Sequence, residues 1–224
     1  MATDNGQGTT DKPVGILAVQ GDFAMHAKML DRLGVPWKLV KHTSDLDDAS
    51  ALIMPGGEST TMLNLFNDEG LGEAIRRFAA AGNPVFGTCA GTILLAKEVT
   101  NPPQEHLGLL DVTVERNAYG RQIDSAVRRG ECPELADRPV EMVFIRAPII
   151  RRVGAAVRIL GRSGGLPVLV EQNNVLAATF HPELTDDETV HRYFLQKLSE
   201  PRPSGSGFRR REASPVASEG QSIT

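Results

Sequence analysis

The chain has 224 residues, 41% of them hydrophobic, which suits one large domain with a buried core. Its 28 acidic and 24 basic residues give a net charge of −4, which argues against a general nucleic-acid binder. No apolar run approaches the ~18 residues that a membrane helix needs, and the polar first twelve residues do not form a secretory signal. Two cysteines are too few for a disulfide framework, so we expect a cytoplasmic protein with reduced thiols.

Both ends of the chain differ in composition from its middle. Residues 200–224 contain five Ser, three Pro and three Gly, and their few large apolar residues show no period. Such a segment cannot bury enough apolar surface to offset the entropy of ordering. We therefore predict disordered tails at 1–13 and 199–224 around one ordered domain at 14–198.

The first half of this domain alternates short apolar runs with amphipathic stretches, which predicts a parallel sheet with helices on both faces. The predicted strands cover residues 14–19, 37–40, 51–54 and 84–87. The predicted helices are one after Phe23, one after the turn at 55–57, one through Leu71, Ile75 and Phe78, and one over 92–97.

The second half contains five apolar runs with little helix between them, which predicts a mixed or antiparallel part of the sheet. These runs cover residues 112–115, 142–145, 157–160, 168–171 and 175–179, and a last helix is predicted over 187–198. The expected architecture is a three-layer α/β sandwich with a central, mostly parallel twisted sheet flanked by helices.

The GTCAG segment at 87–91 lies between a predicted strand and a predicted helix. Its glycines permit the sharp turn of a nucleophile elbow, which raises the Cys89 thiol above the edge of the sheet. The helix N-terminus favours a thiolate there, and the backbone N–H of Ala90 points toward an oxyanion beside the sulfur. We predict that Cys89 is a nucleophile, whereas Cys132 lacks such a context and is interpreted as structural.

A thiol nucleophile needs a base, and His181 is followed by a proline and then by Glu183. The proline favours an extended backbone at His181, where side chains two apart point to the same side. Glu183 can then fix the tautomer of the His181 ring and stabilise its imidazolium. We expect surface roles for the remaining histidines, which are His26, His42, His106 and His191.

The PGGEST segment at 55–60 follows the third predicted strand. Its glycines let backbone N–H groups approach a ligand, although a plain turn with Ser59 or Thr60 capping a helix explains the same residues. The chain contains no G-x-x-x-x-G-K-[ST] pattern and no G-x-G-x-x-G after its first strand, which argues against nucleotide binding. Its histidines and acids show no metal-ligand spacing, so we predict neither a metal nor a cofactor.

GTCAG, PGGEST and FHPEL, in this order, resemble the class I (triad) glutamine amidotransferases. Longer segments are similar to the glutaminase subunits of pyridoxal 5'-phosphate synthases, and they cover residues 18–21 with His26, 55–62, 86–98, 106–122, 144–148 and 180–187. VERN-x-x-GRQ and FIRAP are the specific segments within a resemblance that spans about residues 14–198. Thr92, and the FAM tripeptide before His26, depart from the family pattern.

The resemblance implies a class I glutamine amidotransferase-like fold and a role for each matching residue. Cys89 is the implied nucleophile, His181 the general base and then acid, and Glu183 the carboxylate that orients it. Residues implied to bind glutamine are Gly57, Glu58, Ser59, Arg116, Ile145 and Arg146. The N–H groups of Gly57 and Ala90 form the implied oxyanion hole. Ordinary ion pairing is the alternative for Arg116 and Arg146.

The resemblance also implies that the chain hydrolyses L-glutamine and passes ammonia to a synthase (lyase) subunit, a (β/α)₈ barrel, in a hetero-oligomeric complex. The ordered domain leaves no room for a synthetic domain, so the ammonia acceptor lies on another chain. Docking of this partner activates the family's glutaminases, and we expect the 20–21 segment and the PGG turn near that contact. The alternatives are a subunit of another amidotransferase, such as imidazole glycerol phosphate synthase, and a non-catalytic binding module. A cysteine hydrolase or chaperone-like protein is disfavoured by the His-x-Glu segment.

Overall fold

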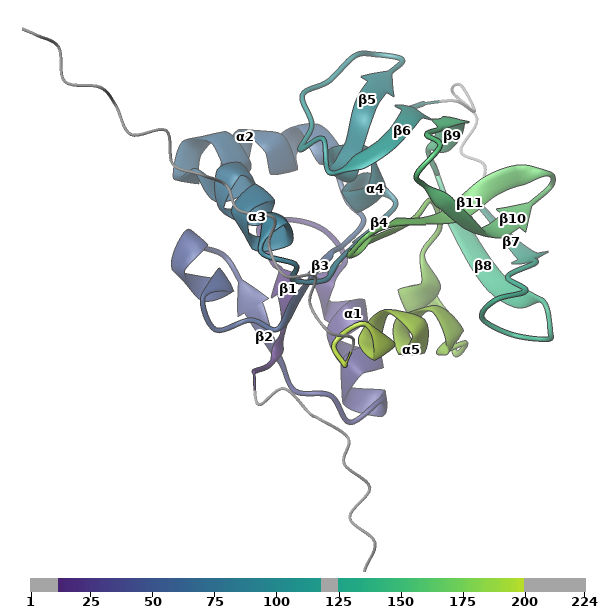
Figure 1. Cartoon of the computed structure of the whole chain (residues 1–224), viewed down its shortest axis with the longest axis horizontal. Helices are drawn as coiled ribbons and strands as arrows, with labels where there is room; N and C mark the ends of the chain where they lie inside the picture. The colour runs from purple at the N-terminus through teal and green to yellow at the C-terminus, as the bar shows by residue number, and fades with distance from the viewer. Residues whose placement is uncertain (1–11, 118–124, 200–224) are drawn as a thin grey trace, which may run out of the picture.

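The computed structural model describes residues 12–117 and 125–199, which form a seven-stranded central sheet, helices on both of its faces and two smaller sheets (Figure 1). The predicted tails lie almost wholly outside these residues, as does the GRQ part of the VERN-x-x-GRQ segment. Within the described residues, no helix has both the length and the apolar character needed to cross a membrane.

The strand order of the central sheet is β10-β11-β12-β4-β3-β1-β2. Five neighbours, from β12 to β2, run parallel, whereas β11 is antiparallel to β12 and β10 to β11. The strands are β1 (Val14–Leu17), β2 (Trp37–Val40), β3 (Ala51–Met54), β4 (Val85–Thr88), β10 (Arg158–Ser163), β11 (Leu166–Gln172) and β12 (Val175–Ala178). The predicted mostly parallel sheet with an antiparallel part is confirmed, but two of the five runs expected in that part, at 112–115 and 142–145, lie in separate smaller sheets.

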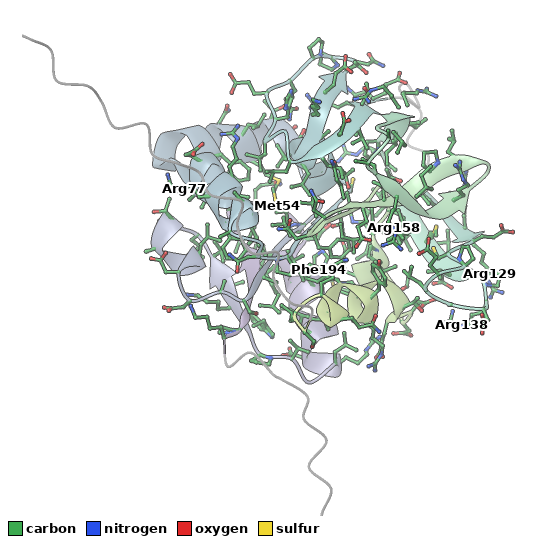
Figure 2. All side chains as sticks on the ribbon, viewed as in Figure 1. Met54, Arg77, Arg129, Arg138, Arg158 and Phe194 are labelled. Atoms are coloured by element: carbon green, nitrogen blue, oxygen red, sulfur yellow. The ribbon has the colours of Figure 1, made fainter. Side chains whose placement is uncertain are left out.

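Two sets of helices cover the two faces of this sheet (Figure 1). The helices are α1 (Phe23–Arg32), α2 (Ser59–Glu69), α3 (Leu71–Ala80), α4 (Ala90–Leu95) and α5 (Thr189–Gln196). Along β3, Leu52 and Met54 pack toward α2, α3 and α4, whereas Ala51 and Ile53 pack toward α1 and α5. A strand buried on both faces has no polar side, which is why it reads as a continuous apolar run. Figure 2 shows Met54 and Phe194 in the interior and Arg129 and Arg138 at the rim.

The two smaller sheets extend the two faces. One contains β5 (Ala96–Thr100), β6 (Leu110–Glu115) and β9 (Ile149–Val153), and the other pairs β7 (Ser125–Gly130) with β8 (Val140–Ile145). Short 3₁₀ turns cover Thr43–Leu46 and Pro182–Leu184. The backbone N–H of His181 donates to the carbonyl of Val143 at 2.8 Å, so the end of β12 is tied to β8.

Two predicted helices have different ends in the structure. The helix predicted over 92–97 ends at Leu95, because Ala96 turns extended (ψ 156°) and begins β5, whose Val99 pairs with Val114 of β6. The last helix begins at Thr189, whose N–H donates to the Asp187 carboxylate at 3.1 Å, rather than at 187 itself. Pairing with a distant strand thus sets the end of α4, and a side-chain hydrogen bond to the first N–H sets the start of α5.

Candidate active site

Cys89 lies between β4 and α4 with φ 47° and ψ −102°, a conformation that L-residues seldom adopt and that costs about 1–3 kcal/mol. Its N–H donates to the carbonyl of Ala178 at 2.8 Å, which fixes the turn to the neighbouring strand. A Cβ on Gly91 would lie 2.2 Å from the carbonyl oxygen of Met54, so only glycine lets α4 begin this close to β3. The GTCAG segment thus forms a strained strand-to-helix turn that presents the thiol at the carboxyl end of the sheet.

His181 and Glu183 follow β12, and both are buried. The Nδ1 atom of His181 is 2.7 Å from Oε1 of Glu183. A Cβ on Gly56 would lie 2.3 Å from Cε1 of His181 and 3.3 Å from Cβ of Cys89, so the ring and the thiol meet above this glycine. The structure therefore brings Cys89, His181 and Glu183 into one row.

The electrostatics of this row favour a protonated ring. Burial lowers the pKa of His181, but its hydrogen bonds to Cys89 and Glu183 and the negative charge of both partners outweigh burial and raise the pKa to about 10. Burial also raises the pKa of Glu183, but the nearby His26 and His181 rings outweigh it and lower this pKa below its usual value. At neutral pH the row thus holds an imidazolium beside a carboxylate.

The end of β8 brings a second backbone segment to the sulfur. The sulfur of Cys89 lies 3.8 Å from the carbonyl oxygen of Ile145. Arg146, the next residue, has a left-handed backbone (φ 45°) and an exposed side chain. The FIRAP segment therefore lies beside the nucleophile elbow.

The glycine turn at 55–57 packs against residues 20–22. The N–H of Glu58 donates to Oε1 of Gln20 at 2.8 Å, and the N–H of Asp22 donates to the carbonyl of Gly56 at 3.2 Å. Gly21 has φ 103°, and a Cβ there would lie 1.9 Å from the carbonyl oxygen of Gly56. A movement of the 20–21 segment would therefore be transmitted to the turn.

The carboxylate of Glu58 caps its own helix. It accepts hydrogen bonds from the N–H groups of Thr60 at 3.1 Å and Thr61 at 2.8 Å. Burial raises the pKa of Glu58, but these hydrogen bonds outweigh it and lower the pKa. The side chain thus acts as the N-cap of α2, a role that the sequence had offered to Ser59 or Thr60.

Arg116 joins the start of α2 from the end of β6. Its guanidinium donates to Oγ1 of Thr60 at 3.2 Å and lies 3.7 Å from Oε1 of Glu58, with 14% of the side chain exposed. Ser59 is buried and donates to Oε1 of Gln104 at 2.9 Å. Four residues predicted to bind substrate therefore gather at this helix end, which are Gly57, Glu58, Ser59 and Arg116. The ion pair considered as the alternative for Arg116 is also present.

The expectation that His26 and His191 lie at the surface is wrong. Both are fully buried, and Nε2 of His26 lies 3.5 Å from Oε2 of Glu183. The available signal was helical spacing, because His26 lies three residues after Phe23 and four before Leu30, on the apolar face of α1. A contact with a residue far along the chain has no local signature, so this one could not be predicted.

The second thiol lies in a different environment. Cys132 is buried among apolar side chains, and burial raises its pKa to about 11, which makes it a poor nucleophile at neutral pH. Across residues 12–117 and 125–199, no group of three or more His, Cys, Asp or Glu side chains is placed to hold a metal ion. A thiol, a base and an orienting carboxylate in a row are the groups that acyl transfer requires.

Comparison with known proteins agrees with this arrangement. The model of the SNO glutamine amidotransferase family matches residues 16–200. The chain belongs to this glutamine amidotransferase family. The pyridoxal 5'-phosphate synthase subunit PdxT of Solibacter usitatus is 53% identical over 192 residues, which cover 84% of this chain and 100% of the relative. PdxT of Thermus thermophilus is 52% identical over 185 residues, 82% of this chain and 96% of the relative.

Solved structures show the same fold. A crystal structure of a glutamine amidotransferase superposes with a TM-score of 0.78 at 48% identity and covers 83% of this chain and 98% of its own. PurLQS from Thermotoga maritima has a TM-score of 0.66 at 18% identity over 84% of this chain and 99% of its own, and it supports the fold alone. The predicted glutamine amidotransferase-like fold and the resemblance drawn from GTCAG, PGGEST and FHPEL are confirmed.

Proposed function

We propose that this chain is the glutaminase subunit of a pyridoxal 5'-phosphate synthase and hydrolyses L-glutamine to L-glutamate and ammonia. The observation that carries the proposal is the His181 ring, which contacts the Cys89 thiol on one side and the Glu183 carboxylate on the other. The PdxT relatives, about half identical over nearly their whole length, support this assignment over another amidotransferase.

The reaction begins with the sulfur of Cys89, whose proton His181 carries as an imidazolium; this sulfur attacks the side-chain carboxamide carbon of glutamine and forms a C–S bond. The electron pair of the C=O bond moves to oxygen. Ala90, the first residue of α4, and Gly57 offer backbone N–H groups to this oxyanion. A well-placed donor of this kind contributes about 3–4 kcal/mol in comparable enzymes.

His181 then moves protons in both halves of the reaction. Its imidazolium protonates the departing nitrogen, so the C–N bond breaks and ammonia leaves a γ-glutamyl thioester on Cys89. The neutral ring next takes a proton from water, whose oxygen attacks the thioester and releases glutamate and the sulfur. Glu183, 2.7 Å from Nδ1, holds the ring in one orientation through both steps.

The substrate's own charges need partners at the helix start and at the end of β8. We assign glutamine binding to Gly57, Glu58, Ser59, Arg116, Ile145 and Arg146, and the supporting observation is that the first four gather at α2. Arg116 offers a cation to the substrate carboxylate, and the Ile145 carbonyl, beside the sulfur, offers an acceptor to a nitrogen.

The ammonia acceptor is assigned to a second chain, a (β/α)₈ lyase subunit in a hetero-oligomeric complex. Contacts of Gln20, Gly21 and Asp22 with the glycine turn support the idea that docking there adjusts the oxyanion hole. We assign the glutaminase domain to residues 14–198, between tails at 1–13 and 199–224. A thiol nucleophile works only while reduced, which favours the cytoplasm as its compartment.

The test is ammonia release by the full chain, measured alone and with the synthase subunit of a pyridoxal 5'-phosphate synthase. We expect the mixture to release ammonia much faster than the isolated chain, and Cys89→Ala to bind glutamine without releasing ammonia. Cys132→Ala is the matched control and should keep the activity. Equal rates with and without the partner would refute docking activation, and turnover by Cys89→Ala would refute the nucleophile.

A further inference from the structure

A second buried polar cluster lies directly behind Glu183, on the side away from Cys89. It consists of His26 from α1, His191 from α5 and Thr88 from the end of β4, all of them fully buried. Nε2 of His26 is 3.5 Å from Oε2 of Glu183 and 3.2 Å from Oγ1 of Thr88. Nδ1 of His26 is 3.0 Å from Nε2 of His191. The row of catalytic groups therefore continues through the core to α1 and α5, two helices that lie next to each other in Figure 1.

The positions of the protons follow from these distances. A proton on Nδ1 of His26 would leave its Nε2 lone pair facing the carboxylate of Glu183, which is repulsive. With the proton on Nε2, His26 points an N–H at Glu183 and Thr88 and accepts a hydrogen bond from His191. This arrangement also leaves a lone pair, rather than an N–H, on the Nδ1 atom of His191, which has no hydrogen-bond partner among the described residues.

We propose that His26 is a positioning residue, whose Nε2–H holds the second oxygen of Glu183 and is itself oriented by His191. The proposal rests on the proposed function, because it assumes that Glu183 orients the catalytic ring of His181. Oε2 of Glu183 makes no hydrogen bond among the described residues, and Nε2 of His26, 3.5 Å away, is the side-chain nitrogen placed to donate to it.

Electrostatics explain why neutral imidazoles suit this position. Burial lowers the pKa of His26 and lowers that of His191 to about 3, so both rings are neutral at neutral pH. A neutral donor fixes the carboxylate but leaves its charge available to the His181 imidazolium, whereas a cation would compete for that charge. The titratable groups that face Glu183 are His181 and His26, with Cys89, His191 and Asp22 beyond them.

Packing alone does not account for these two rings. His191 and Phe194 both lie against Phe86, with ring centroids 5.7 and 5.3 Å away, so this core accepts apolar side chains. A buried imidazole costs free energy unless its nitrogens are hydrogen-bonded, and a leucine would fill similar space without that cost. Because the chain keeps an imidazole here despite this cost, we infer that its N–H group has a role.

The test compares His26→Leu with His26→Gln in the full chain bound to the synthase subunit. His26→Leu removes the donor and should lower kcat about tenfold while KM changes less than about twofold. Without the donor, Glu183 takes up a proton more easily, so the acid limb of the pH profile of kcat/KM should move to higher pH. His26→Gln places an amide N–H near the position of Nε2 and should restore both quantities in large part.

Phe194→Leu is the matched control, because it disturbs the same core on α5 without touching the carboxylate. It should lower the unfolding temperature and leave the pH profile in place. The proposal would be overturned if His26→Leu folded and kept the kcat and the acid limb of the wild type. It would also be overturned if both His26 variants lost the same kcat and neither moved the acid limb.

A second measurement separates this proposal from the proposed function and does not require a folded variant. Nitrogen-15 NMR of the wild-type chain should show His26 as a neutral ring protonated at Nε2, and a ring protonated at Nδ1 or a cationic ring at neutral pH would overturn the proposal. Wild-type chain that releases no ammonia with its partner would contradict the proposed function, while the tautomer would still decide the role of His26.

Discussion

Two buried glutamates in the same core have opposite surroundings. Glu183 and Glu171 are 2% and 3% exposed. Glu171, on β11, lies 2.6 Å from Arg158, pairs with Lys197 just after α5, and accepts the hydroxyl of Tyr193 at 3.0 Å. Glu183 has two imidazoles at 2.7 and 3.5 Å in place of these permanent cations.

The two environments allow their carboxylates different roles. Arg and Lys keep their charge at all ordinary pH values, so the pairs of Glu171 fasten the end of α5 to the sheet and do not change during a reaction. Imidazoles gain and lose protons near neutral pH, so the partner of Glu183 can move a proton while the carboxylate stays fixed. We therefore assign a stabilising role to Glu171 and propose a catalytic one for Glu183.

Exchanging each glutamate for glutamine should separate these two roles and give the largest effects. Glu183→Gln should lower kcat about 10³–10⁴-fold, because the ring loses the charge that supports its imidazolium. Glu171→Gln should lower the free energy of unfolding by about 3 kcal/mol, because Lys197 is left buried without an anion. Ammonia release per folded molecule and urea unfolding measure the two quantities.

Each variant controls for the other. Glu171→Gln should retain wild-type kcat within about twofold, because Glu171 contacts no catalytic group. A large loss of kcat in Glu171→Gln, or nearly full activity in Glu183→Gln, would remove the distinction between the two carboxylates.

A methyl group at Gly56 tests the proposed catalytic position of His181 without changing Glu171. The Cβ of Gly56→Ala would lie 2.3 Å from Cε1 of His181, so the ring must move away from the thiol. We expect a shift of the ring by about 1 Å to cost about a hundredfold in kcat. Gly72→Ala is the control, since a Cβ there meets its nearest neighbour at 3.4 Å, and it should keep its activity. Undiminished kcat in Gly56→Ala would mean that the ring does not act from this position.

The pH dependence of stability distinguishes a titrating partner from permanent cations. The pKa of His181 is raised from 6.5 to about 10. Its contribution to the free energy of unfolding is therefore complete below pH 6.5 and is lost as the pH rises toward 10. Between these pH values the free energy of unfolding of the wild type should fall, relative to that of His181→Gln, by up to about 1.4 kcal/mol per pH unit. Denaturant unfolding at several pH values measures the difference, and a constant difference would contradict the raised pKa.

A third carboxylate, nearer the surface, should give the smallest effect. Burial raises the pKa of Asp187, but hydrogen bonds from Arg138 and Thr189 outweigh it and lower the pKa below 3.8. Asp187→Ala removes the carboxylate that accepts from the first N–H of α5 and should cost about 1 kcal/mol at neutral pH. Because the pKa is lowered, the cost should disappear as the pH falls below 3.8. A cost that persists in acid would show that the charge of Asp187 is not its source.

The sequence predicted every strand of the central sheet, and the strands whose burial is complete are the ones it marks most clearly. The runs of β1, β3 and β12 are apolar at every position, so their composition alone marks them. β5, β7 and β9 were missed, because most residues of Ser125–Gly130 are exposed and the strand exists only through its pairing with Val140–Ile145. Pairing between distant segments leaves no local pattern.

The residues of the candidate site likewise fall into those that local sequence predicted and those that it could not predict. Cys89, His181 and Glu183 stand in short motifs whose turns place them, so local chemistry was enough to propose them. His26 and His191 lie 165 positions apart and meet only when α1 and α5 pack on the same face of the sheet. The capping role of Glu58 was also missed, because the turn brings its carboxylate back to two N–H groups of its own helix.

The most direct test of the account is the site of covalent labelling by a glutamine analogue with an electrophilic carbon in place of its amide. The full chain, bound to the synthase subunit, would be treated with this analogue and mapped by peptide mass spectrometry. The account predicts one adduct on Cys89, prevented by excess glutamine, and none on Cys132. Labelling of Cys132 to the same extent, or no adduct on Cys89, would contradict the claim that His181 and the helix start make Cys89 the nucleophile.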